Sequence, residues 1–76
     1  MNQPPIIIDL IGDRCPIPVK KIRNLLQKYP RGTLIHALGD DPESLHDIPA
    51  LLIRLNLEPA IITKEEIGWK FIILVN

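Results

Sequence analysis

Cys15 is the only cysteine in the chain, and its position in Arg14-Cys15-Pro16-Ile17-Pro18 favours a reactive thiol. Apolar residues recur at helical spacing directly after it, so the sulfur stands at a helix start. The positive end of a helix and the charge of Arg14 should both lower the pKa of Cys15. Pro16 and Pro18 restrict the backbone and would hold the sulfur outward. The alternative is a structural cysteine, because free cysteines are among the most buried residues.

The remaining residues narrow what this thiol can do. His36 falls inside a predicted strand and His46 in a predicted turn, so neither is placed to act as a general base for Cys15. One cysteine and two scattered histidines make a poor zinc site, and no metal is expected. A dithiol oxidoreductase is excluded because it needs a second cysteine. A lone activated thiol is best suited to carrying a group that a partner supplies.

A second polar segment, Asp40-Asp41-Pro42, allows two interpretations. Asp41 before Pro42 is a favourable helix start, with an N-cap oxygen followed by a proline at the first helical position. Alternatively, both aspartates lie near Cys15 and shape the contact with a partner. Because a close carboxylate would raise the pKa of the thiol, neither is predicted to be catalytic.

Charge is distributed unevenly along this chain of zero net charge. Residues 1–38 hold six basic and two acidic side chains, a balance of +4, whereas residues 39–76 hold three basic and seven acidic ones, a balance of −4. The basic side chains Lys20, Lys21 and Arg23 fall in the first predicted helix and are candidates for binding a partner. The alternative is an ordinary solvated helix surface.

The elements that position these residues can be predicted from periodicity. Residues 6–11 are β-branched and apolar, which predicts a strand that ends at Gly12. The apolar positions from Val19 to Tyr29 predict an amphipathic helix with Pro18 in its first turn. Residues 33–38 predict a second strand.

Pro49 interrupts the next helical pattern, which runs through Leu45, Ile48, Leu52 and Leu55. Because proline lacks an amide hydrogen, we expect a short turn over residues 42–47 and a new helix from about 48 to 56, with a kink between them. Residues 58–64 and 69–75 predict a strand hairpin with a loop of four residues, 65–68.

The predicted order is therefore strand, helix, strand, helix, strand, strand. The first three strands should run parallel and the fourth antiparallel to the third, with the two helices on one face of the sheet. Both helical connections then leave their strands at the same end. This arrangement brings residues 12–18 close to residues 39–42, at the carboxyl edge where α/β folds tend to place chemistry.

Length and composition bound the class of protein. Seventy-six residues predict a single domain, residues 1–76, with a flexible N-terminus over residues 1–5. A lone cysteine favours a reducing cytoplasm. The longest apolar runs are too short to span a membrane, and the first residues lack the basic region of a signal peptide. Zero net charge and few aromatic residues argue against direct nucleic-acid binding.

Two motifs together resemble the TusA family of small sulfur carriers. Gly12-x-x-Cys15-Pro16-x-Pro18 is similar to its Cys-Pro-x-Pro signature, and Asp40-Asp41-Pro42 with Asp47-Ile48-Pro49 is similar to its second signature. The similarity runs from about residue 8 to residue 74. The resemblance implies a two-layer α/β sandwich, with a four-stranded mixed sheet and both helices on one face.

The resemblance also implies a function. In the family, a cysteine desulfurase or rhodanese-like donor transfers a persulfide sulfur to the signature cysteine, here Cys15, which passes it to another protein. No cofactor is implied beyond that transient persulfide, and the implied pathways are tRNA thiolation, molybdenum-cofactor sulfur supply, sulfur oxidation and regulation. The competing hypothesis is a non-catalytic binding module that uses the basic face of the first helix.

Overall fold

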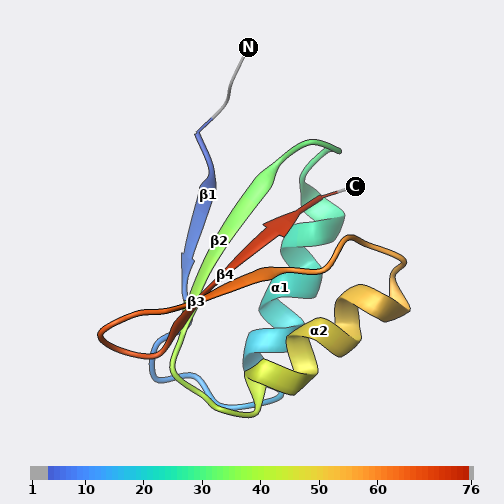
Figure 1. Ribbon diagram of the computed structural model, residues 1–76. Helices are drawn as coiled ribbons and strands as arrows, with labels where there is room; N and C mark the ends of the chain where they lie inside the picture. Colours follow the sequence, from blue (N-terminus) through green and yellow to red (C-terminus); the bar gives the residue numbers. More distant parts are fainter. Residues whose placement is uncertain (1–3, 76) are drawn as a thin grey trace.

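Two helices cover one face of a four-stranded sheet in the computed structural model, which describes residues 4–75 (Figure 1). The predicted α/β sandwich and its element order are confirmed. Residues 1–3 of the predicted flexible N-terminus lie outside the described residues, and Pro4 and Pro5 precede the first strand without regular structure. The elements are β1 (Ile6–Asp9), α1 (Ile17–Lys28), β2 (Leu34–Gly39), α2 (Ser44–Arg54), β3 (Ile61–Lys64) and β4 (Trp69–Leu74).

The strands lie in the order β1-β2-β4-β3. β1 pairs with β2 in parallel, and β4 is antiparallel to both of its neighbours, so the first three strands share one direction as predicted. The predicted hairpin is also confirmed, because Lys64 pairs with Trp69 and leaves a loop of residues 65–68. The final strand thus lies between β2 and β3, an order that the sequence did not indicate.

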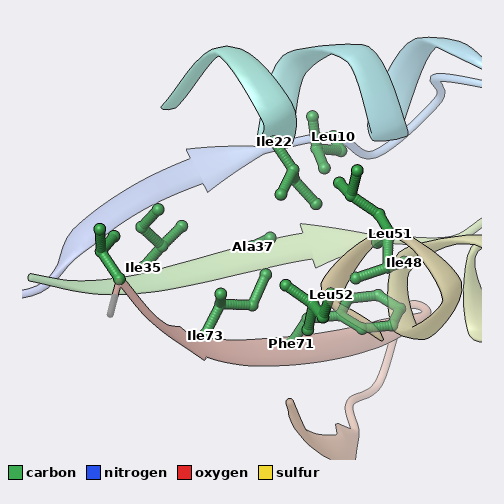
Figure 2. Close-up of a cluster of buried hydrophobic side chains, with 10 residues drawn as sticks. Leu10, Ile22, Ile35, Ala37, Ile48, Leu51, Leu52, Phe71 and Ile73 are labelled. Carbon is green, nitrogen blue, oxygen red and sulfur yellow. The ribbon is translucent and has the colours of Figure 1, made fainter. Parts of the chain in front are cut away.

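The core lies between the sheet and the helices (Figure 2). Alternate residues of β2 and β4 point toward the helices, as the two-residue period of a strand requires. Ile22 meets them from α1, where the predicted amphipathic spacing is confirmed, with Pro18 buried in the first turn. The core residues that Figure 2 labels are Leu10, Ile22, Ile35, Ala37, Ile48, Leu51, Leu52, Phe71 and Ile73.

The predicted break before Pro49 is wrong, because α2 runs without interruption from Ser44 to Arg54 with Pro49 inside it. A proline inside a helix costs about 3 kcal/mol, since one hydrogen bond is lost and the ring crowds the preceding turn. The same helix buries Ile48, Leu51 and Leu52 in the core, and each such burial contributes about 1.5–3 kcal/mol. Packing therefore outweighs the local preference.

The hairpin loop packs tightly on the end of β2 through Gly68. This glycine has a φ of 72°, and a Cβ atom there would overlap the carbonyl oxygen of Gly39 and lie 2.7 Å from Cα of Asp40. Gly32 has a comparable φ of 90°, but a Cβ atom there would meet nothing within 4 Å. Substitution of either glycine would strain the backbone, but only substitution of Gly68 would also cause a steric overlap.

We expect Gly68→Ala to destabilise the protein far more than Gly32→Ala. Both substitutions carry the cost of a left-handed backbone, about 1–2 kcal/mol, but only the first also forces the hairpin away from Gly39. A domain of this size has a free energy of unfolding of about 4–11 kcal/mol, so Gly68→Ala should remove much of it. Urea unfolding of both variants measures the difference, and equal losses would contradict the close approach at Gly68.

Candidate functional site

The loop that carries Cys15 is bound to the loop after β2, as the predicted topology requires. The amide of Gly12 donates to Asp40 Oδ1 at 2.9 Å, and the amide of Cys15 donates to Asp41 Oδ2 at 2.7 Å. The two segments are 26 or more residues apart in sequence but adjacent at the carboxyl end of the parallel strands. The expected meeting of these loops is confirmed.

Asp41 clamps this junction and also binds the start of α2. Its side chain is buried and accepts a hydrogen bond from the Glu43 amide at 3.2 Å, which is the contact predicted for an N-cap oxygen. The regular helix begins later than predicted, because Pro42 lies in the turn before it and Glu43 is the residue that directly precedes Ser44. The Cys15 amide is the main reason that the pKa of Asp41 lies below its ordinary value. A charged carboxylate therefore holds the backbone of the thiol-bearing residue.

Arg14 pairs with Asp40 rather than with the sulfur. Its guanidinium Nη1 lies 2.9 Å from Asp40 Oδ1, and its side chain remains 62% exposed. The pKa of Asp40 is lowered first by the Gly12 amide and then by Arg14. The positive charge of Arg14, which directly precedes Cys15 in the sequence, is therefore paired with Asp40 in the loop after β2 and not with the sulfur of Cys15.

The sulfur of Cys15 lies between the first turns of both helices. Cys15 is half-buried and immediately precedes Pro16, the N-cap residue of α1. Its Sγ lies 3.9 Å from Oγ of the buried Ser44, the first residue of α2, and the carboxylate of Asp47, one turn further, is close enough to raise the pKa of the thiol. The atom is neither sealed in the core nor fully open to solvent.

Sequence reasoning did not identify Ser44 and Asp47 as neighbours of the thiol. Their spacing of three places them on one side of a helix, and this signal was available. It was hidden because the expected break at Pro49 assigned both residues to a turn.

The prediction of a lowered thiol pKa is wrong. Partial burial, followed by the carboxylate of Asp47, raises the pKa of Cys15 to about 11, and Asp41 acts in the same direction. The Ser44 hydroxyl opposes them by stabilising the thiolate. Desolvation and nearby negative charge therefore exceed any stabilisation from the helix ends, and the thiol is protonated at neutral pH.

An open groove adjoins the sulfur between α1 and α2. Its volume is about 180 Å³. It is mostly apolar, with one acidic and one basic residue. The lining residues are Pro16, Val19, Asp47, Ala50, Leu51 and Arg54. Because Pro16 and Asp47 also border Cys15, a side chain placed in the groove would lie beside the thiol.

The three predicted partner-binding residues of α1 are exposed, but they are not equivalent. Lys21 Nζ lies 2.7 Å from Asp13 Oδ2, so that charge is partly neutralised within the loop before the helix. Lys20 and Arg23 are exposed on the same helix. The accessible basic charge near the thiol is thus smaller than the sequence count suggested.

The two histidines lie away from the contacts of the thiol. His36 is half-buried on β2 and His46 is exposed on α2, and neither hydrogen-bonds Cys15 within residues 4–75. The same part of the chain contains no group of three or more His, Cys, Asp or Glu side chains that could hold a metal ion. Neither of its helices combines the length and apolar character that crossing a membrane requires.

Fold and site together define a small α/β protein with one partly accessible thiol held where two helices begin. The family described as Sulfurtransferase TusA matches residues 6–75, and the chain belongs to this family. Two relatives from Archaeoglobus fulgidus are each named "Putative sulfur carrier protein". One is 38% identical over 61 residues, which cover 80% of this chain and 79% of the relative. The other is 26% identical over 68 residues, covering 90% and 93%.

We expect Asp47→Asn to lower the pKa of Cys15, because the substitution removes a carboxylate that disfavours the thiolate. The rate of Cys15 alkylation against pH should have its midpoint near 11 in the wild type and at a lower pH in the variant. At neutral pH the variant should therefore react several-fold faster. Glu43→Gln changes an exposed carboxylate of the same helix start and should leave the profile unchanged. A wild-type midpoint at or below the ordinary cysteine value of about 8.5 would contradict this account.

Proposed function

We propose that the protein is a sulfur carrier that holds a sulfane sulfur as a persulfide on Cys15. The observation that carries the proposal is the position of the single thiol, half-buried but reachable, at the junction of two helix starts. Membership of the TusA family and two relatives named as sulfur carriers support it. The protein is proposed to act in the cytoplasm.

The reaction is an exchange between a thiol and a persulfide. Cys15 attacks the outer sulfur of a donor persulfide, a new sulfur–sulfur bond forms on Cys15, and the sulfur–sulfur bond of the donor breaks. The donor leaves as a thiol that carries the proton lost by Cys15. Delivery to an acceptor thiol repeats the step in the opposite sense. No electrons enter or leave the pair, so no cofactor is needed beyond the transient persulfide.

The carboxylates around the sulfur suit a carrier that is inactive until it is docked. A protonated thiol at neutral pH reacts slowly with oxidants, since susceptibility follows thiolate character. Asp47 is close enough to the thiol to raise its pKa and is the group proposed to pass the thiol proton toward the leaving donor sulfur. The Ser44 hydroxyl can then stabilise the negative sulfur as it forms.

Both partners in this proposal are proteins. The donor would be a cysteine desulfurase or a rhodanese-like protein, and the groove between α1 and α2 would receive the residues flanking its persulfide. Lys20, Lys21 and Arg23 lie on the helix that follows the thiol and are proposed to contact the donor surface. Gly12, Arg14 and Asp41 hold the loop from which the sulfur is presented.

Incubation with a cysteine desulfurase and cysteine should add one sulfur atom to the wild-type protein. Intact mass measurement should show this adduct, and dithiothreitol should remove it because a persulfide is reducible. Cys15→Ser should remain unmodified under the same conditions. An equal adduct on Cys15→Ser, or none on the wild type with any donor tested, would contradict the proposal.

Charge reversal on α1 should separate docking from chemistry. We expect the combined variant Lys20→Glu and Arg23→Glu to slow loading from a protein donor about tenfold or more, while loading from a small-molecule persulfide is unchanged. Lys28→Glu, a single charge reversal at the far end of the same helix, is the control and should leave loading from the protein donor nearly unchanged. If Cys15→Ser instead left partner binding intact while the charge reversal abolished it, the result would favour a binding module in which the thiol is incidental.

A further inference from the structure

The sheet face opposite the helices is uncovered by any part of residues 4–75 (Figure 1) and carries exposed isoleucine on both edge strands. The strand register identifies its residues, because directly paired positions share a face. Ile7, paired with His36, is 68% exposed on β1, and Ile61, paired with Ile72, is 62% exposed on β3. Contiguous apolar surface of this kind marks an interaction site.

The residues of this face form three rows across the strands. The middle row reads Ile7, His36, Ile72, Ile61 in the strand order β1-β2-β4-β3. The row nearer Cys15 reads Asp9, Leu38, Lys70, Thr63, and the far row contains Leu34 and Leu74. The two most exposed isoleucines thus occupy opposite edges of the same row.

We propose that this open face pairs with the same face of a second copy, forming a symmetric dimer whose two-fold axis is parallel to the strands. Such an axis places β1 of one copy over β3 of the other and β2 over β4. Ile7 then lies against Ile61 of the second copy, and Leu34 against Leu74. Each row faces the same row of the second copy, with the order of the strands reversed. The most exposed apolar side chains of the two copies therefore cover one another.

Charge also favours this axis. Lys70 on β4 lies over Leu38 of the second copy, which is paired with Asp9. Its long side chain can therefore reach that carboxylate. By symmetry the dimer contains this contact twice. An axis perpendicular to the strands would instead set the row of Asp9 and Lys70 against the leucines of the far row. That arrangement would bury both charges without partners, which is costly.

The size of the face predicts a weak dimer. Four strands spaced about 4.8 Å apart, with about five residues each, cover roughly 320 Å² per copy in projection. Twice this area is below the size of stable specific interfaces, so we expect a transient dimer that dissociates in the high-micromolar to millimolar range. Both Cys15 loops lie at the same end of the dimer and outside the interface. Sulfur loading is therefore independent of pairing.

Sedimentation over the micromolar to millimolar range should show a reversible monomer–dimer equilibrium. Ile7→Lys and Ile61→Lys should each weaken it at least tenfold, because a charge would be buried against an isoleucine of the other copy. Both positions are largely exposed in the monomer, so circular dichroism should confirm native folding. Ile53→Lys is the matched control, since Ile53 is 75% exposed on α2 in the other layer. It should leave the equilibrium unchanged.

A cross-link tests the direction of the axis. In a Cys15→Ser chain, an equal mixture of the single variants Ile7→Cys and Ile61→Cys should give a mixed covalent dimer with a short thiol–thiol cross-linker, whereas either variant alone should give much less. An axis perpendicular to the strands would instead cross-link each variant to itself. A wild type that stays monomeric throughout would overturn the proposal. Dissociation by Ile53→Lys but not Ile7→Lys, or growth beyond the dimer, would also overturn it.

Discussion

The hydrogen bond from the Cys15 amide to the carboxylate of Asp41 is the contact on which the site depends. This bond of 2.7 Å joins the segment between β1 and α1 to the segment between β2 and α2. Asp41 is buried and simultaneously holds the Glu43 amide, so one charged side chain organises the approach to both helices. Asp40 holds the same loop through the Gly12 amide and Arg14, but Asp41 is the residue that binds the backbone of Cys15 itself.

The same carboxylates that position the thiol also make it a poor nucleophile in isolation. Burial, Asp47 and Asp41 all raise its pKa, while the Ser44 hydroxyl opposes them. For a carrier this combination is useful, because a protonated thiol resists oxidation while the protein is not bound to a partner. The thiolate then has to form only in the complex with a partner. Partner binding can change both the water around the sulfur and the charges that face it, and these are the causes of the raised pKa.

The two faces of the sheet have different roles. One is closed by α1 and α2 and provides the core, with Ile35, Ala37, Phe71 and Ile73 directed toward the helices. The other carries isoleucine and leucine at positions where a solvated sheet would be polar. Because β4 lies between β2 and β3, its outward residues Ile72 and Leu74 meet the outward residues of both neighbours, and apolar side chains extend across the sheet.

Local patterns of residues were enough to predict the elements and the meeting of the two loops. Helical spacing after Cys15, alternation in the strands and the four-residue hairpin loop are local signals, and connection geometry alone brings residues 12–18 to residues 39–42. The helix through Pro49 could not be predicted in this way, because it depends on core burial by α2 that exceeds the local cost of proline. The strand order and the environment of the sulfur could not be predicted from local patterns either. Both depend on contacts between distant segments, and the raised pKa of Cys15 follows from burial and then from Asp47 and Asp41, which lie more than 25 residues away in the sequence.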